Sequence, residues 1–383
     1  MSSDVATQSP PVYLTALTTM RGVAALWVVF FHMDVILFYR DFGHLMPLGD
    51  SGLVAKGYLW VDFFFLLSGF IIYHIYGGQF SRNVTGRTLV NFIWGRFSRI
   101  YPLHLFTLAV LIGFSSLLPL FLPSVVDDSW TLYFDTAALP SNLLLTNAMN
   151  QHSYLSWNIV SWSIGAEWWA YMGGMLLLVL LGRRSLVVTS GVMGLAAIFL
   201  VGLVYSRAEP TLDITFDRGF FRCLFDFTIG VGLYQFYRRS VAFAWLKKDT
   251  VFLGLFLAVV AHFHGNWHDL WIIPLFSMMI LALAYNRDLV ARCLAWTPLH
   301  YLGKISYSVY LMHGVWFMVF WFLLPLWASA PFSPLDRLHF GSAFLGLTLM
   351  SAALTYPLIE VRSRRYLRQK FTFPRSSLAK EKI

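Results

Sequence analysis

The sequence is poor in charged residues and in cysteine. Asp, Glu, Lys and Arg make up only 12% of the 383 residues, while hydrophobic residues make up 58%. Soluble domains carry roughly 25% charged residues, so this composition argues against a soluble protein. Cys223 and Cys293 are the only cysteines, and they have no metal or redox spacing. A disulfide framework, an iron–sulfur cluster and a zinc ribbon are therefore not expected.

The sequence also lacks a basic stripe, a signal peptide and an internal repeat. The net charge is +9, but Lys and Arg are scattered between apolar runs, so we expect no nucleic-acid partner. The first twenty residues have no basic segment, and Arg21 interrupts the first apolar run, so the first helix is expected to remain as an anchor. Without a repeat or a long linker, we expect one membrane domain, residues 16–360, between an N-terminal segment, 1–15, and a basic tail, 361–383.

Long apolar runs separated by short polar connections predict an all-α membrane helix bundle. Runs of about 20 apolar residues are long enough to cross the hydrocarbon core of a bilayer. Hydropathy predicts about ten spans, near residues 16–38, 58–76, 101–122, 159–181, 186–205, 220–237, 251–264, 270–285, 305–327 and 340–359.

The distribution of basic residues predicts the orientation of these spans. If the N-terminus is cytoplasmic, the inner loops and the tail receive most of the cations: Arg82, Arg87, Arg96, Arg99, Arg183, Arg184, Arg238, Arg239, Lys247, Lys248, Arg287, Arg292, Lys304, Arg362, Arg364, Arg365, Arg368 and Lys370. The outer loops receive few, among them Arg222. The positive-inside rule then places both termini in the cytoplasm. We interpret the basic tail as an orientation signal near anionic lipid and not as part of an enzymatic site.

The first helix contains two ionisable side chains in an apolar segment. Arg21 and His32 are eleven residues apart, which puts them on nearly one helical face and about 16 Å apart along the axis. Gly22 and Ala25 share much of that face, so other helices can approach it closely. A buried imidazole tends to stay neutral, which suits a general base. The alternative is an interhelical hydrogen bond without a chemical role.

Arg96 and Arg99 precede the third predicted span. They are one turn apart, so they should project together from its cytoplasmic end. Such a pair can bind phosphate oxygens. From the spacing alone, the better interpretation is that both side chains extend to the lipid headgroups.

Two carboxylates are expected in the outer half of the membrane. Asp62 opens the second predicted span, and Glu167 follows Ser163 by one turn in the fourth. Both helices enter from the outer face, so both carboxylates should lie in the outer half, the half that also holds His32. A carboxylate that accepts the imidazole proton would fix the tautomer and stabilise a transient imidazolium.

Two further polar groups have competing interpretations. The ninth predicted span has a polar stripe that either binds substrate or joins helices: Ser306, Tyr310 and His313. A cluster after the seventh span is either a metal site or a polar turn: His262, His264, His268 and Asp269. We expect no metal, because no carboxylate or cysteine spacing completes a known site.

In their order along the chain, these segments resemble acyltransferase family 3, integral-membrane acyltransferases that modify bacterial surface polysaccharides and some secreted small molecules. The resemblance rests on five motifs: Arg21-Gly22-Val23-Ala24-Ala25 with His32, Val61 to Phe70, Arg96 to Pro102, Trp162-Ser163 with Glu167, and Ile305 to His313. Tyr356 and Glu360 also fit. One departure is Trp168-Trp169-Ala170-Tyr171, where the family usually has a Phe-Tyr pair, so the acceptor pocket is expected to differ.

The resemblance implies an acyl-CoA donor, acetyl-CoA by default, and an acceptor hydroxyl on a polysaccharide or lipid-linked glycan. It implies a multi-pass protein of the bacterial inner membrane, in contact with lipid. It is compatible with a homo-oligomer. No appended extracellular domain is expected, so the membrane domain or a partner handles the acceptor.

The resemblance also assigns roles to the candidate residues. Those expected to bind the donor are Arg21, Arg96 and Arg99. Those expected at the chemical step are His32, Glu167 and Asp62. Those expected to bind substrate are Ser163, Trp162, Tyr310, His313 and Ser306. His32 either deprotonates the acceptor or is briefly acylated, and Glu167 or Asp62 orients it.

The same buried groups allow two other functions. A proton-coupled transporter could use the buried His, Asp and Glu side chains as a relay, but it would predict inverted repeats with broken helices, and the sequence has none. In a scaffold or sensor, the polar groups would only hold the bundle together.

Overall fold

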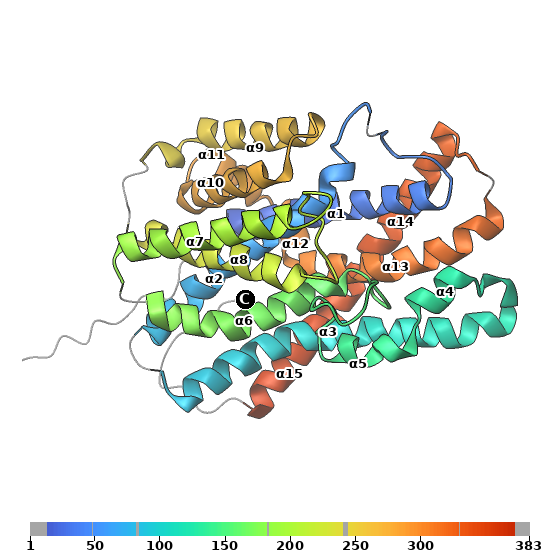
Figure 1. Ribbon diagram of the computed structural model, residues 1–383, viewed down its shortest axis with the longest axis horizontal. Coiled ribbons are helices and arrows are strands. Elements are labelled where there is room, and N and C mark those ends of the chain that lie inside the picture. Colours follow the sequence, from blue (N-terminus) through green and yellow to red (C-terminus); the bar gives the residue numbers. More distant parts are fainter. Residues whose placement is uncertain are drawn as a thin grey trace, which may run out of the picture.

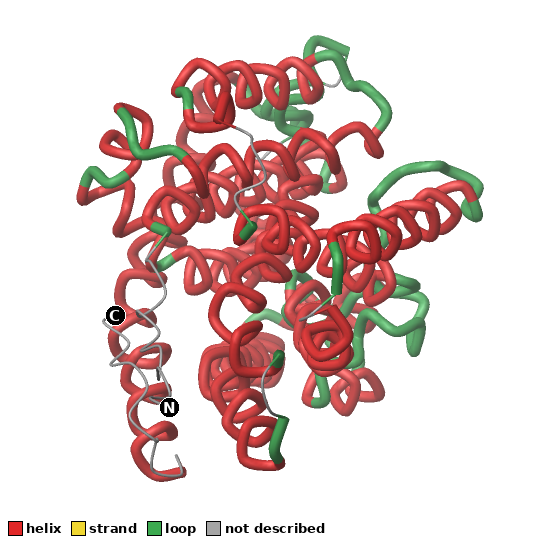
Figure 2. The backbone as a smooth tube through the Cα atoms, turned by 90° about the vertical axis from the view of Figure 1, so that its left-hand side faces the viewer, coloured by secondary structure: helices red, strands yellow, loops and turns green. Residues whose placement is uncertain are grey.

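The computed structural model describes residues 14–371 except 48, 82–83, 182–183, 240–243 and 329. Most of the segment 1–15, the end of the tail, Arg82 and Arg183 lie outside the described residues, so the predictions for them are untested. Every regular element in the described part is a helix (Figure 2). The prediction of an all-α bundle is confirmed.

The main helices run side by side along the longest axis of the molecule (Figure 1). They are α1 (Thr15–Tyr39), α2 (Trp60–Phe80), α3 (Gly86–Phe121), α6 (Ser161–Leu181), α7 (Leu186–Tyr205), α8 (Gly219–Arg238), α9 (Asp249–His264), α10 (Ile272–Tyr285), α13 (Ser306–Trp327) and α14 (Pro334–Thr355). The shorter helices are α4 (Asp128–Tyr133), α5 (Leu139–Leu143), α11 (Leu289–Leu294), α12 (Thr297–Lys304) and α15 (Arg362–Phe371).

Single-turn elements complete the chain. The 3-10 turns are Ala55–Leu59, Pro123–Val125, Thr136–Ala138, Ala244–Lys247 and Asp269–Trp271. A π-helical turn, Tyr356–Val361, joins α14 to α15. Pro357 lies in this turn, where its missing N–H is compatible with the irregular hydrogen bonding.

Within the described residues, seven helical segments are long and apolar enough to cross a membrane: Thr15–Tyr39, Ala55–Phe80, Gly86–Phe121, Ser161–Leu181, Leu186–Tyr205, Ser306–Trp327 and Pro334–Lys370. The protein is therefore a multi-pass membrane protein. The other three predicted spans correspond to α8, which carries Arg222 and Asp226, and to the shorter apolar helices α9 and α10. That all ten cross the membrane with cytoplasmic termini remains a prediction.

Glycines let the helices approach to backbone contact. α8 packs against α2, α6 and α7 at the centre of the bundle. A Cβ atom added at Gly69 of α2 would overlap the carbonyl oxygen of Phe227, and one at Gly230 of α8 would overlap that of Leu66. On the other side of the bundle, Gly22 of α1 contacts α12, as its place on the small-residue face predicted.

Replacing Gly69 by Ala should separate α2 from α8. Because the methyl group would meet a backbone carbonyl, we expect a loss of stability of about 1–3 kcal/mol, typical of overpacking. Thermal unfolding of the purified protein in detergent measures it. Gly254→Ala is the matched control, since a Cβ atom there meets nothing within 4 Å. Equal midpoints for the two variants would contradict the close α2–α8 contact.

Candidate active site

A cavity opens inside the bundle on the side where α1 begins, which is the predicted cytoplasmic side. The cavity and its mouth hold about 940 Å³ of space not occupied by protein atoms. Most of the wall is apolar, and the polar lining consists of Arg21, Ser68, Arg96, Arg99, Ser163, Glu167, Tyr171, Ser306, Tyr307 and Tyr310. Seven of the predicted site residues therefore meet at one cavity. A concave apolar site with a few convergent polar groups is typical of ligand-binding sites.

The arginine pair lies inside a helix and not at its free end. α3 begins at Gly86, ten residues before Arg96, and the side chain of Thr85 caps it by accepting from the Thr88 N–H. Hydropathy missed this start because the first turns of α3 carry polar residues such as Arg87. Arg96 is only 5% exposed, so the expectation that it extends to the lipid headgroups is wrong.

Aromatic rings hold the Arg96 guanidinium at the cavity wall. It donates to the Tyr76 hydroxyl at 3.2 Å, and it lies 5.4 Å from the Tyr76 ring and 5.9 Å from the Tyr171 ring. Cation–π contacts orient a guanidinium without neutralising it. The two rings and the Tyr76 hydroxyl therefore fix the position of the guanidinium at the wall.

The Glu167 carboxylate forms its hydrogen bonds within the cavity wall and not with His32. Its Oε1 accepts from the Ser68 hydroxyl of α2 and, at 2.5 Å, from the Tyr171 hydroxyl one turn further along α6. The expectation that Glu167 orients His32 is not met in the described chain, because these two hydroxyls are its hydrogen-bond partners. Tyr171 belongs to the segment that departs from the family pattern, so that departure reaches the cavity.

Asp62 belongs to a buried ion pair. Arg222 Nε and Nη2 each donate to one Asp62 oxygen at 2.7 Å, and both side chains are buried. The Trp162 ring lies 5.6 Å from the guanidinium carbon. Arg222 was expected in an outer loop, but it lies inside α8. Asp62 and Trp162 thus join α2, α6 and α8 and are not among the residues that line the cavity.

His32 pairs with a second histidine. Its Nδ1 lies 3.0 Å from the Val28 carbonyl oxygen and 3.3 Å from Nε2 of His313. The Nδ1 of His313 lies 3.2 Å from the Val309 carbonyl oxygen. Because a carbonyl only accepts, each Nδ1 carries a hydrogen, and the lone pair of His313 Nε2 faces the Nδ1–H of His32. This assignment leaves His32 Nε2 unprotonated.

The His32–His313 pair takes the place of the expected histidine–carboxylate pair. The rings of Phe31 and Phe317 lie 5.0 Å and 5.8 Å from the His32 ring and fix its orientation. His313 was expected in the polar stripe of the ninth predicted span, but its pairing with His32 was not expected. The fixed tautomer of His32, with a second nitrogen base behind it, is suited to accept a proton at Nε2.

Tyr310 connects the cavity to the histidine pair. Its hydroxyl forms a 2.8 Å hydrogen bond with the Ser163 hydroxyl at the cavity wall, and its ring lies 5.3 Å from that of His313. Ser306, one turn earlier on α13, lines the cavity with a buried hydroxyl that has no hydrogen-bond partner in the described chain. The polar stripe of α13 thus runs from the cavity to His32.

The histidine cluster that follows α9 is hydrogen-bonded mainly to the segment before α2. Asp269 accepts from Lys56 Nζ at 2.5 Å and from the Tyr58 hydroxyl at 2.6 Å. His262 bonds to the His268 carbonyl, and His264 bonds to Ser51. In the described part of the chain, no group of three or more His, Cys, Asp or Glu residues could hold a metal ion.

Comparisons with known proteins identify relatives along most of the chain. A family model described as an acyltransferase domain matches residues 14–360. Acyltransferase MdmB of Streptomyces mycarofaciens is 27% identical over 333 residues, which cover 79% of each chain. Peptidoglycan O-acetyltransferase OatA of Listeria monocytogenes is 22% identical over 334 residues, 79% of this chain and 49% of OatA.

A further relative matches a shorter region. Protein 2 in the picA locus of Rhizobium radiobacter is 38% identical over 122 residues, 32% of this chain and 56% of that protein. The chain therefore spans about half the length of this relative and of OatA. No solved structure matches.

Proposed function

The chain belongs to the acyltransferase family whose domain covers residues 14–360, and from this premise we propose that it transfers an acetyl group from cytoplasmic acetyl-CoA to a hydroxyl of an exported or surface glycan. The family and the named relatives support a membrane O-acyltransferase. The name of OatA, a peptidoglycan O-acetyltransferase, supports the acetyl group and the glycan. Family membership favours this reaction over proton-coupled transport.

One observation carries the proposal: a positively charged cavity leads from the predicted cytoplasmic side towards His32. Arg21, Arg96 and Arg99 supply guanidinium groups, which bind phosphate oxygens in forked geometry. Beyond these arginines the wall is mainly apolar, so it fits the long arm of acetyl-CoA that carries the thioester. The cavity ends at Tyr310 and Ser163, next to the histidine pair.

The proposed chemical step uses the free nitrogen of His32. Nε2 removes the proton of the acceptor hydroxyl as its oxygen attacks the thioester carbonyl carbon. The tetrahedral intermediate then collapses, the carbon–sulfur bond breaks, and the leaving thiolate takes the proton from His32. The hydrogen bond from Nδ1–H to His313 Nε2 stabilises the imidazolium formed in between.

The same geometry serves the alternative in which His32 is acylated. Nε2 would then attack the thioester carbonyl carbon, and the carbon–sulfur bond would break to release the CoA thiolate. In a second step the acceptor oxygen would attack the acetyl-imidazole, the carbon–nitrogen bond would break, and the acceptor proton would go to the thiolate. In both routes the acceptor reaches His32 from the outer face. We assign to the hydroxyl groups of Tyr310 and Ser163 the role of hydrogen-bond donors to the acyl carbonyl oxygen.

Arg96→Ala tests the donor site. Because the variant loses charge-assisted hydrogen bonds to phosphate, we expect acetyl-CoA to bind at least about tenfold more weakly. Titration calorimetry on purified protein in lipid nanodiscs measures the dissociation constant, and radiolabelled acetyl-CoA reports turnover.

Arg292→Ala is the matched control, since it removes one exposed cation of α11 on the same predicted side. Equal affinities of the two variants would remove Arg96 from the donor site. A wild-type protein that neither binds nor cleaves acetyl-CoA would refute the proposed function.

A further inference from the structure

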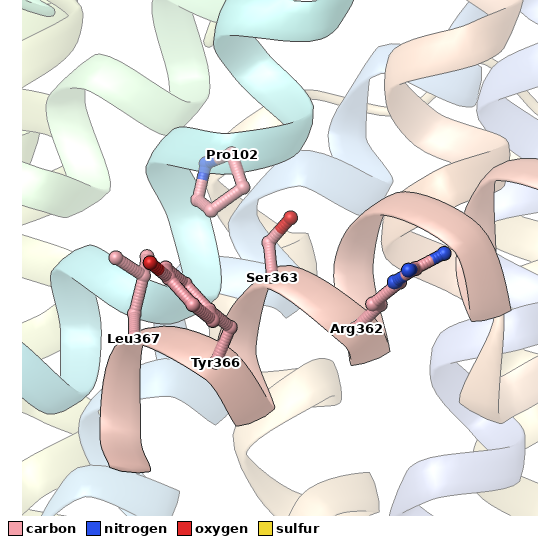
Figure 3. Close-up of a pocket in the computed structure, with 5 residues that line it drawn as sticks. All are labelled: Pro102, Arg362, Ser363, Tyr366 and Leu367. Atoms are coloured by element: carbon pink, nitrogen blue, oxygen red, sulfur yellow. The ribbon is translucent and has the colours of Figure 1, made fainter. Parts of the chain in front are cut away.

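A surface groove and the cavity of the candidate active site differ in how their polar groups find partners. The groove lies between α3 and α15 and is lined by Pro102, Arg362, Ser363, Tyr366 and Leu367 (Figure 3). Arg362 points away from Tyr366 and Leu367, and both Arg362 and Tyr366 are exposed, so water can hydrogen-bond to their polar atoms. In the cavity, by contrast, Ser306 is only 1% exposed. Its hydroxyl therefore needs a partner from the protein or from a group that enters the cavity.

Six hydroxyl groups line the cavity, and five of them form hydrogen bonds within the described chain. The five are those of Ser68, Ser163, Tyr171, Tyr307 and Tyr310. The sixth, the Ser306 hydroxyl, has no hydrogen-bond partner in this part of the protein. A buried polar group without a partner is costly, so a hydroxyl of this kind at a cavity wall indicates a site that a ligand completes.

The usual structural roles of serine do not explain Ser306. At the start of a helix serine typically caps the backbone, but Ser306 comes after Ile305, the N-cap residue of α13, and no side chain caps this end. Inside a helix serine typically bonds back to a carbonyl about one turn earlier, as Ser163 does to the Val160 carbonyl at 3.0 Å. The Ser306 hydroxyl makes neither bond. This leaves a group that enters the cavity as its partner.

Ser306 lies one helical turn from the proposed site of the thioester. It precedes Tyr310 by four residues, about 6 Å along the axis of α13, on the side from which the donor enters. In acetyl-CoA, two methylene groups separate the thioester sulfur from the nearest amide of the arm. With the acyl carbonyl at Tyr310, this amide reaches the level of Ser306. The wall around it is mainly apolar, and an amide buried there without a partner is unfavourable.

We propose that the Ser306 hydroxyl forms a hydrogen bond with the amide of the donor arm that is nearest to the thioester. This proposal rests on the proposed function and deepens it, because it makes Ser306 the residue that recognises the pantetheine arm of the donor, in addition to the arginines that bind its phosphates. The hydroxyl and the amide, each without a partner in the cavity, then satisfy one another. Ser306 binds the donor and takes no part in the making or breaking of bonds.

Calorimetric titration of the full-length protein in lipid nanodiscs tests the proposal with two ligands. One is CoA, and the other is a CoA analogue in which the amide nearest to the sulfur is replaced by two methylene groups. In Ser306→Ala we expect the ratio of the two affinities, CoA over analogue, to fall about three- to tenfold from its wild-type value, as the loss of one hydrogen bond predicts. The variant should bind the analogue no more weakly than the wild type does, which shows that its cavity is intact.

Ser308→Ala is the matched control. The Ser308 hydroxyl, two positions further along α13, is also buried but donates to Glu360 at 3.1 Å, so this variant should have a lower thermal midpoint and the wild-type affinity ratio. Ser306→Ala removes a hydroxyl without a partner and should not lower the midpoint. An unchanged affinity ratio in Ser306→Ala overturns the proposal, and so does a midpoint that falls as far as in Ser308→Ala, because the protein itself would then supply the partner. A wild type that binds neither ligand refutes instead the proposed function.

Discussion

Replacing His32 by Ala is expected to reduce acetyl transfer by about 10²- to 10⁴-fold while acetyl-CoA still binds. The substitution removes the only nitrogen to which the proposed mechanism assigns proton transfer or acylation. It leaves the arginines of the proposed donor site in place, since His32 is not among the residues that line the cavity. Single-turnover transfer from radiolabelled acetyl-CoA to a glycan acceptor measures the loss, and calorimetry checks binding.

Two substitutions of His313 test whether it supports His32 in the chemical step. His313→Leu removes the acceptor that faces His32 Nδ1–H, so turnover should fall with little change in KM. His313→Gln offers an amide oxygen at that place and should retain more turnover.

Intact-mass measurement of the wild type with acetyl-CoA and no acceptor then separates the two routes, because only the acyl-histidine route adds an acetyl group to the protein. Unchanged turnover in His32→Ala would show that the chemical step lies elsewhere.

Arg222→Ala is expected to cost about 3–5 kcal/mol of stability, enough to prevent accumulation of folded protein. The substitution leaves Asp62 buried without its partner, and Asp226, one turn along α8, also loses the interaction with this guanidinium. The yield of monodisperse protein and its thermal midpoint in detergent measure the effect.

Two variants make the Arg222 result specific. Arg218→Ala removes a half-exposed arginine one turn earlier, which lies 4.0 Å from Asp217, and should be nearly neutral. Asp62→Leu with Arg222→Leu should recover part of the stability, because the Asp62 carboxylate is no longer buried without its partner, whereas Asp226 still loses the guanidinium. If the Arg222 and Arg218 single variants have equal midpoints, the buried pair does not hold α2 to α8.

The sequence was sufficient for the helices but not for the contacts between them. Hydropathy located α7 within a residue because both of its ends have clear polar boundaries. It began the third span at residue 101, whereas α3 begins at Gly86, because a hydropathy average ends where polar residues enter a helix, even when they are buried. Arg96 was therefore expected to extend to the lipid headgroups, whereas its side chain is buried.

The partners in the site are far apart along the chain. His32 and His313 are separated by 281 positions, and Asp62 and Arg222 by 160. Helical periodicity tells which residues share a face of one helix, but which faces meet depends on packing, such as the backbone contact at Gly69 and Gly230. The motif resemblance named both histidines as candidate residues, but it did not predict that the partner of His32 is an imidazole.

The π-helical turn Tyr356–Val361 determines in which direction the side chains of α15 point around the helix axis. A π turn holds one residue more than a regular α-helical turn, so deleting one residue there would rotate all later side chains by about 100°. Such a rotation would carry Arg364 and Arg368 off α3, against which α15 packs, and bring other side chains into their place. The wide turn thus acts as a register shift: one extra residue decides which side of the tail helix faces the rest of the protein.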